Sequence, residues 1–344
     1  MIRIGIAGCG YWGPNLVRAF SRTPGCRVLS VCDIAEDRLT ALVQMYPWIS
    51  FTTSTDQFLA DTRLDAIVIA TPVATHAELA MKALRSGRHV FIEKPMVADS
   101  QSALRLIDEA ERRSLTLMVD YPFVFGTPVR KIADLISAGE IGDFYYYDSV
   151  RINLGRFQSD VNVLWDLAAH DLSILDYLTH QCPSAVSATG AKHAKAGFHT
   201  MAYLTMFYDD GLLGHVHVNW LAPLKIRRTL IGGSQQMIVY DELEPSEKVR
   251  VYDRGVWQSS LGHTDHASRQ MAIGYRSGDM WAPHLEVRDA LETAATQFVE
   301  CVVAKARPLT DGQSGLRVVR LLEAATESLM ASGRPIHTKA EVCS

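Results

Sequence analysis

Hydrophobic and polar positions alternate between two kinds of segment over the first 120 residues. Short runs of Val, Ile, Leu and Ala predict buried strands at Ile2–Ala7, Arg27–Cys32, Ala66–Ala70, His89–Ile92 and Leu115–Val119. Between them, helical periodicity predicts amphipathic helices at Trp12–Ser21, Ala35–Met45, Ala74–Ser86 and Ser100–Arg113. This alternation predicts an α/β fold with βαβ units and a doubly wound parallel sheet.

The pattern changes after Tyr121, where segments with period-two alternation replace the short apolar runs. They predict a second α/β domain with a large, mostly antiparallel sheet from Phe144–Leu154, Met201–Tyr208, Leu212–Trp220, Arg227–Ile231 and Met237–Tyr240. Helices are predicted at Pro128–Ala138, Leu164–Leu178, Leu285–Ala304 and Gly315–Ala331, and segment 258–283 is expected to be a long loop. We expect domains at 1–121 and 122–344, with the last helix packing back on the first domain.

Length and composition agree with a two-domain globular protein. The chain has 344 residues and a net charge of −4, so neither nucleic acid nor an anionic membrane is an expected partner. No apolar run approaches the length of a bilayer span, and Met1–Ala7 is better explained as a buried strand than as a signal sequence. The six cysteines show neither a CxxC pair nor metal-ligand spacing, which indicates reduced thiols in a cytoplasmic protein without a metal site.

The glycine motif Gly8-Cys9-Gly10-Tyr11-Trp12-Gly13 follows the first predicted strand and opens the first helix. Such spacing also arises by chance, but this context favours a Rossmann dinucleotide site. Gly8 permits the tight turn, Gly10 lets the backbone approach the pyrophosphate, and Gly13 lets the helix pack on the strand. Asp33 ends the next strand, where its carboxylate would accept both ribose hydroxyls and repel a 2′-phosphate, so NAD is favoured over NADP.

Two further groups are candidates for chemistry. Lys94 lies in Glu93-Lys94-Pro95, directly after a strand whose carboxyl end belongs to the ligand crevice, although a lysine there is often only a solvated charge. Asp166 and His170 are four residues apart on one predicted helix, so Asp166 could orient His170 and raise its pKa for general-base work. The alternative is a surface pair of little consequence, and Asp171 and Asp176 are expected to be cap or surface residues.

Taken together, these motifs resemble the Gfo/Idh/MocA family (glucose–fructose oxidoreductase, inositol dehydrogenase and relatives). The resemblance covers essentially the whole chain. Its matching pieces are Gly8 to Gly13, Ala70-Thr71-Pro72 with His76, Glu93-Lys94-Pro95, Asp166-x-x-x-His170 and Tyr275-Arg276-Ser277-Gly278-Asp279. Two positions depart from the family pattern: Ala168 replaces a glycine between Asp166 and His170, and Val124 lies near an expected arginine.

The resemblance implies a role for each matching residue. Lys94 would hydrogen-bond the hydroxyl being oxidised, with a cis peptide before Pro95, while His170 removes the proton and Asp166 holds substrate and tunes His170. The residues implied at the cofactor, besides the glycines and Asp33, are Tyr11, Trp12, Thr71, Pro72, His76, Glu93 and Lys94. Trp12 could instead simply cover the helix start. The open face of the second sheet implies a homodimer or homotetramer.

The segment between the first strand of the second domain and the Asp166 helix is expected to line the substrate pocket. Arg151 and Arg156 could bind a carboxylate or phosphate, or could instead form internal salt bridges. Gln158 and Asn162 could bind sugar hydroxyls. Within the family this segment resembles members that oxidise nucleotide-linked sugars, notably UDP-N-acetylglucosaminuronate 3-dehydrogenases of surface-polysaccharide pathways, with C3 oxidation implied.

Several alternatives remain open at the level of sequence. An inositol or free-sugar dehydrogenase, an NAD-assisted glycosidase that releases NAD unchanged, and a non-catalytic NAD-sensing regulator share the motifs discussed above. Retention of Lys94, Asp166 and His170 argues against the regulator, because a sensor needs no base. His215-x-His217 is expected to be a pair on a sheet surface and His263-x-x-His266 a solvated loop cluster, so no metal is expected.

Overall fold

A computed structural model describes residues 1–155, 161–193, 197–259 and 272–338. Its first sheet has six parallel strands in the order β3-β2-β1-β4-β5-β6. The strands are β1 (Ile2–Ala7), β2 (Cys26–Cys32), β3 (Ser50–Thr52), β4 (Ala66–Ile69), β5 (His89–Glu93) and β6 (Leu117–Asp120). This order confirms the predicted Rossmann sheet, whose crevice opens where the strand order reverses, between β1 and β4. Strand β3 is an addition that the pattern had not indicated.

Helices connect these strands and cover the first sheet. They are α1 (Gly13–Arg22), α2 (Asp37–Met45), α3 (Thr55–Ala60), α4 (Val73–Arg85) and α5 (Ser100–Arg113). All strands except the short edge strand β3 bury most of their side chains, as in β4, where all four residues are buried. Burial on both faces explains why the strands read as continuous apolar runs instead of alternating ones.

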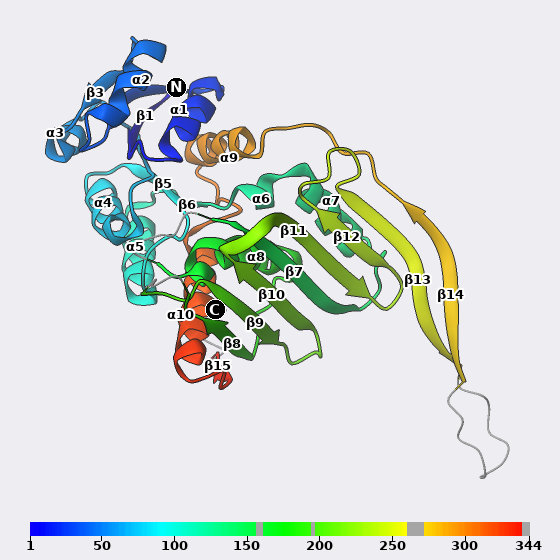
Figure 1. Cartoon of the computed structure of the whole chain (residues 1–344). Coiled ribbons are helices and arrows are strands. Elements are labelled where there is room, and N and C mark those ends of the chain that lie inside the picture. Colours follow the sequence, from blue (N-terminus) through cyan, green and yellow to red (C-terminus); the bar gives the residue numbers. More distant parts are fainter. Residues whose placement is uncertain (156–160, 194–196, 260–271, 339–344) are drawn as a thin grey trace.

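The second sheet has nine strands in the order β14-β13-β12-β11-β7-β10-β9-β8-β15 (Figure 1). They are β7 (Phe144–Leu154), β8 (Ala185–Ala191), β9 (Met201–Phe207), β10 (Leu213–Asn219), β11 (Leu221–Gly233), β12 (Met237–Asp241), β13 (Val249–Ser259), β14 (Ala272–Trp281) and β15 (Ile336–His337). All pairs are antiparallel except β7 with β10. The mostly antiparallel second sheet is therefore confirmed.

One face of the second sheet is covered by helices and the other is open. Strand β9 alternates buried and exposed residues along its length, which is typical of a sheet with one solvated face. The helices of this part of the chain are α6 (Pro122–Phe125), α7 (Thr127–Ser137), the π-helical turn η1 (Leu164–Ala168), α8 (Ala169–Thr179), α9 (Ala290–Ala304) and α10 (Gly312–Met330). Helix α10 packs against β8 and α8, and also against α5 and β6 of the first domain.

Two sequence-based expectations are wrong here. Segment 258–283 was expected to be a long loop, but Ala272–Trp281 forms β14, which pairs with β13 in an antiparallel arm that extends away from the body (Figure 1). Its mixture of apolar and polar residues is compatible with a strand because pairing with β13 holds it in the arm. Reduced thiols were also expected throughout; Cys9, Cys26, Cys32 and Cys301 are free, but Cys182 is disulfide-bonded. Local spacing does not reveal which cysteines the fold brings together.

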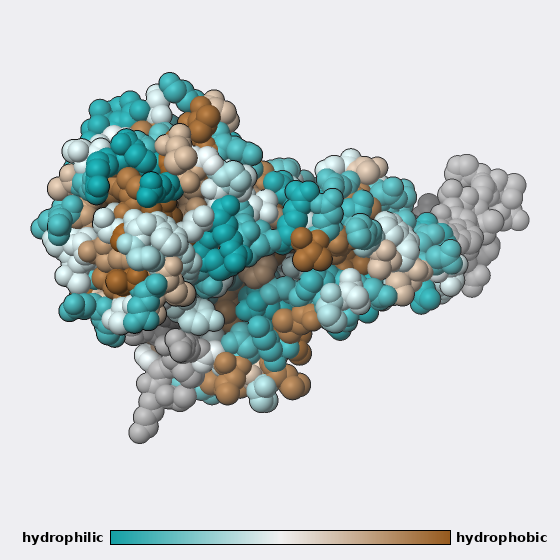
Figure 2. All heavy atoms as spheres, turned by 90° about the horizontal axis from the view of Figure 1, so that it is seen from above, coloured by the Kyte–Doolittle hydropathy of each residue, from teal (hydrophilic) through white to brown (hydrophobic). Residues whose placement is uncertain are grey.

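The surface seen from above narrows from the bulky first domain toward the β13–β14 arm, and hydrophilic residues cover most of this face (Figure 2). Hydrophobic side chains nevertheless gather on the arm, where Val256, Tyr275, Met280 and Trp281 are exposed. Within the described ranges, no helix combines the length and apolar character needed to cross a membrane.

Candidate active site

The three glycines of the loop between β1 and α1 have different structural roles. Gly8 has φ +97°, and a Cβ there would lie 2.5 Å from the backbone oxygen of Ala70. A Cβ on Gly13 would lie 2.1 Å from the oxygen of Gly8, so this glycine is required for packing inside the loop. Gly10, in contrast, has nothing within 4 Å of a Cβ. The space beside Gly10, at the N-terminus of α1, fits a pyrophosphate.

Asp33 lies next to this loop at the end of β2. Its Oδ2 accepts a hydrogen bond from the Cys9 amide at 2.6 Å, and its Oδ1 accepts one from the Ala35 amide at 2.9 Å. The nearest guanidinium, that of Arg38, lies 3.7 Å from Oδ2. The carboxylate is thus held in one orientation beside the glycine loop, where an adenosine ribose would lie in this fold.

Tyr11 and Trp12 differ in their surroundings. Tyr11 is 79% exposed, with its ring stacked on Trp12 at 6.4 Å between centroids. The Trp12 indole Nε1 donates to Asp120 Oδ2 at 3.4 Å, so Trp12 reaches from the loop to the end of β6. Trp12 therefore does more than cover the start of α1: it links the glycine loop to a carboxylate at the crevice.

Thr71 and Pro72 form the turn into α4, beside the end of β4, and His76 lies in the first turn of that helix. The His76 ring is buried, with Nε2 2.8 Å from the Thr71 oxygen and Nδ1 3.1 Å from the Pro95 oxygen. His76 was expected at the cofactor, and its ring lies between the backbone of the Thr71 turn and that of the segment after Lys94. Both neighbours are carbonyl acceptors, so a neutral ring donates to one of them at a time.

A pair of carboxylates occupies the ends of two adjacent strands. Glu93 ends β5 and Asp120 ends β6, in register with one another. Burial raises the pKa of Glu93 well above its usual value, and the adjacent Asp120 carboxylate raises it further. Burial also raises the pKa of Asp120, to about 6. The two carboxyl groups are hydrogen-bonded to each other, and the buried atoms Glu93 Oε1 and Asp120 Oδ1 have no further partner within the described chain, so a bound ligand could donate to them.

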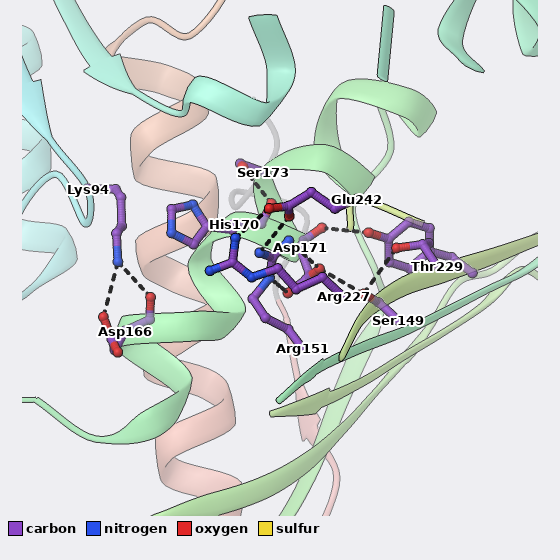
Figure 3. A network of polar contacts seen from close by, with 11 residues as sticks. Lys94, Ser149, Arg151, Asp166, His170, Asp171, Ser173, Arg227, Thr229 and Glu242 are labelled. Carbon is purple, nitrogen blue, oxygen red and sulfur yellow. Dashed lines mark hydrogen bonds and ion pairs between the residues drawn. The ribbon is translucent and has the colours of Figure 1, made fainter. Parts of the chain in front are cut away.

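Lys94 connects the two domains. The Lys94–Pro95 peptide is cis, as the family resemblance implied. Lys94 Nζ donates to the backbone oxygen of Asp166 at 2.6 Å and to its Oδ1 at 3.2 Å. The other carboxylate oxygen, Oδ2, accepts from the indole of the buried Trp220 at 2.9 Å. Figure 3 shows Lys94 and Asp166 facing each other beside the His170 ring. Sequence reasoning had not identified Trp220, whose contact with Asp166 spans two elements.

His170 is the second residue of α8. Its ring packs edge-on against the Phe123 ring, with 4.9 Å between the two centroids. Burial lowers the pKa of His170 well below 6.5, and the cations Lys94, Arg151 and Arg227 lower it further. The imidazole is therefore neutral at pH 7, with a buried Nδ1 that has no hydrogen-bond partner among the described residues. A neutral imidazole in a cleft is the form that accepts a proton.

Asp166 was expected to orient His170 and to raise its pKa. The side-chain contacts of Asp166 are instead with Lys94 and Trp220, and the pKa of His170 is lowered by burial and nearby cations. Asp166 lies in the π-helical turn η1, whose wider winding breaks the i,i+4 alignment of an α-helix. Asp166 instead holds the Lys94 ammonium.

Arg151 was expected to bind substrate, and the structure favours the internal ion-pair alternative. Its Nε donates to Asp171 Oδ2 at 2.7 Å and its Nη1 to Glu242 Oε2 at 3.2 Å, with only 4% of the side chain exposed. The guanidinium also lies 4.7 Å from the centre of the Phe123 ring. Asp171, expected at a cap or on the surface, is thus a buried partner of Arg151.

Two other expectations about this region have clear outcomes, and a third concerns residues that are not described. Asn162 is buried, and its Oδ1 accepts from the amides of Leu164 and Trp165, so it caps the start of η1 instead of facing a sugar. Asp176 is buried in an ion pair with Arg317 at 2.6 Å, not on the surface. Arg156 and Gln158 lie outside the described residues.

Comparison with known proteins agrees with this geometry. Residues 2–121 match the oxidoreductase family with an NAD-binding Rossmann fold, and residues 129–239 match the GFO/IDH/MocA C-terminal domain. UDP-N-acetylglucosamine 3-dehydrogenase of Acidithiobacillus ferrooxidans is 25% identical over 328 residues, covering 92% of this chain and 94% of that protein. A solved structure of that enzyme superimposes with a TM-score of 0.80, over 96% of this chain and 98% of that one.

Two other relatives are also oxidoreductases. Myo-inositol 2-dehydrogenase of Thermotoga maritima is 22% identical over 343 residues, covering 95% of this chain and 96% of that protein. An uncharacterized oxidoreductase of Streptococcus pneumoniae is 26% identical, and the match spans 56% of its length. Both domains match in the expected order, and named relatives over the full length are dehydrogenases of sugars or polyols. The chain therefore belongs to the Gfo/Idh/MocA family of NAD-binding oxidoreductases.

Proposed function

We propose that this protein is an NAD-dependent dehydrogenase that oxidises a secondary hydroxyl of a sugar. The observation that carries the proposal is the meeting of Lys94, from the end of β5, with the neutral His170 of the second domain at the Rossmann crevice. Lys94 would donate a hydrogen bond to the reacting hydroxyl, and His170 would remove its proton. Bound NAD supplies the hydride acceptor, so the carbinol becomes a ketone. Asp166 would orient the Lys94 ammonium.

The cofactor site is proposed to follow the usual Rossmann geometry. The pyrophosphate would lie beside Gly10 at the α1 N-terminus, with Tyr11 and Trp12 next to it and Asp33 at the ribose. Glu93 and Asp120 would receive donors at the nicotinamide end, because each has a buried oxygen without a partner within the described chain. The fit rests on open space at Gly10 and on these orphaned acceptors.

A matched pair of glycine substitutions tests the pyrophosphate position. Gly13→Ala should lower the free energy of unfolding by at least about 2 kcal/mol, because its Cβ collides with the Gly8 carbonyl. Gly10→Ala should leave the unfolding free energy of the free protein within about 1 kcal/mol and weaken NAD binding at least roughly tenfold. Thermal unfolding and NAD titration measure the two effects. Unchanged NAD affinity in Gly10→Ala would place the pyrophosphate elsewhere.

Asp33 should determine the choice between NAD and NADP. In Asp33→Asn the negative charge is lost while one oxygen remains, and Arg38, 3.7 Å away, becomes free to bind a 2′-phosphate. We expect the KM for NAD to rise on the order of tenfold and the preference for NAD over NADP to fall on the order of a hundredfold. Asp37→Asn, an exposed change in the first turn of α2, is the control. An unaltered preference would remove Asp33 from the ribose site.

The preferred substrate class is a nucleotide-linked sugar, with C3 as the oxidised carbon. The supporting relative is UDP-N-acetylglucosamine 3-dehydrogenase, which aligns over 92% of this chain. The runner-up is an inositol or free sugar, supported by the inositol dehydrogenases. A screen of UDP-sugars, dTDP-sugars and inositols by NADH absorbance separates the two. Sugar release without net NADH would instead support an NAD-assisted glycosidase.

The open face of the second sheet is proposed as a contact between copies of this chain. Aromatic side chains stand exposed on it, including Tyr146, Tyr203 and Phe207. Tyr203 also stacks on His217 with 4.4 Å between ring centroids, which makes a flat surface for a partner sheet. Light scattering after size-exclusion chromatography tests this, with a dimer or tetramer expected and a monomer contradicting it.

A further inference from the structure

Arg227 is a cation at the candidate active site that the sequence-based assignment of the site did not include. It lies on β11 in register with Arg151 on β7, so both side chains extend from the same face of the sheet. Figure 3 shows the Arg227 guanidinium directed toward the His170 ring, on the side opposite Lys94. Arg227 is also one of the three cations that lower the pKa of His170. Its guanidinium is therefore close to the reacting position.

The two arginines differ in how their donors are used. Arg151 is 4% exposed and directs donors to both Asp171 and Glu242. Arg227 Nη1 pairs with Glu242, but its Nε is buried without a hydrogen-bond partner among the described residues, and 24% of its side chain is exposed. A buried N–H without a partner is costly, so such a group is typical of a site that a ligand completes.

We propose that Arg227 binds a carboxylate on the substrate, next to the carbon that is oxidised, so that the substrate is an acidic sugar. This rests on the proposed dehydrogenase function. A guanidinium matches the two oxygens of a carboxylate, and Arg227 combines a partly exposed side chain with an Nε donor that has no partner among the described residues. Glu242, shared between Arg151 and Arg227, holds the guanidinium in position.

The bound anion would also assist the base. The positive charges of Lys94, Arg151 and Arg227 oppose protonation of His170. A carboxylate at Arg227 offsets this charge and stabilises the imidazolium that forms when the hydroxyl loses its proton. The carboxylate of an acidic sugar therefore strengthens binding at Arg227 and also raises the basicity of His170. A neutral sugar has no negative charge and provides neither effect.

The test uses four probes that separate a carboxylate from a diphosphate: UDP-glucuronate, UDP-glucose, glucuronate and glucose, each with NAD present. Dissociation constants are measured by calorimetry and turnover by NADH absorbance, for the wild type and for Arg227→Gln. The control is Arg228→Gln, the next residue, which is exposed on the opposite face of β11 and pairs with Asp241. Arg227→Lys retains the charge and serves as a second variant if Arg227→Gln folds poorly.

We expect the wild type to bind each acid more tightly than its neutral counterpart. Arg227→Gln should weaken binding of the acids roughly 10- to 100-fold and leave the neutral sugars unchanged, and Arg227→Lys should retain part of the preference. Removing the charge should also move the acidic limb of kcat/KM to higher pH, because one cation no longer lowers the pKa of His170. Arg228→Gln should do none of this.

Several results would overturn the proposal. Equal weakening of acids and neutral sugars would make Arg227 structural. Weakening of both UDP-sugars, but of neither free sugar, would identify the diphosphate as its ligand. Absence of an acid preference in the wild type would also contradict it. Because binding is measured apart from turnover, acid-selective binding without NADH formation would refute the dehydrogenase function and leave the carboxylate site standing.

Discussion

Replacing Lys94 by Ala should lower kcat on the order of a thousandfold while NAD still binds. Lys94 Nζ is held by the backbone oxygen and the Oδ1 of Asp166, at 2.6 and 3.2 Å, so the ammonium is oriented before substrate arrives. Its loss removes the donor to the reacting hydroxyl and leaves the Asp166 carboxylate near the oxygen that must become an anion. Single-turnover NADH formation measures the chemical step, and NAD titration checks the cofactor site.

The control for Lys94 is Lys82→Ala. Lys82 lies on α4, half-exposed, and pairs with the exposed Glu78 on the same helix, so its loss should change kcat less than about twofold. Turnover of Lys94→Ala within a few-fold of the wild type would refute the assigned role. A parallel loss of NAD affinity would instead make Lys94 a cofactor residue.

Replacing His170 by Ala should lower kcat/KM by about two to four orders of magnitude and remove its acidic limb. The pKa of His170 is lowered by burial and by Lys94, Arg151 and Arg227. In the wild type the imidazole is thus the neutral base at pH 7, and activity should fall only as the pH drops well below 6.5. Without the imidazole, kcat/KM should be flat across that range. The pH profile of kcat/KM measures this directly.

His180→Asn provides the matched control for His170. His180 caps the C-terminus of the same helix, α8, in a left-handed conformation with φ 51° that asparagine also adopts. The variant should keep the wild-type activity and pH profile. An acidic limb that persists in His170→Ala would assign the titrating group elsewhere, with the Glu93–Asp120 pair as the next candidate.

The fold of the first domain was accessible from local pattern alone. Parallel strands covered on both faces read as short apolar runs, and the amphipathic helices between them are equally local. The sequence pattern did not predict β3 or α3. A strand of three residues and a helix of six are too short to show a hydrophobic period. In the second domain β14 was missed, since its sequence mixes apolar residues with Gly, Ser, Arg and Asp and its strand character depends on pairing with β13.

The candidate site divides along the same line. A glycine indicates a tight turn without reference to any distant residue, so the glycine loop was identifiable from sequence. Glu93-Lys94-Pro95 was identifiable because it directly follows the end of a predicted strand. Roles that depend on a distant partner were not. From the sequence, Arg151 could either bind substrate or form an internal salt bridge. The structure shows the salt bridge, in which Glu242 lies 91 residues away along the chain. Trp220 and Arg227 were missed for the same reason.

The sequence by itself determined the NAD-binding Rossmann fold, the family and the glycine loop, because each depends on periodicity or on residues adjacent in the chain. Only the tertiary structure decided the state of the candidate catalytic groups. The pKa of His170 falls because the fold buries it among three cations, and Asp166 serves Lys94, 72 residues away, instead of His170. Electrostatic effects depend on distance in space and on burial, and spacing along the chain specifies neither.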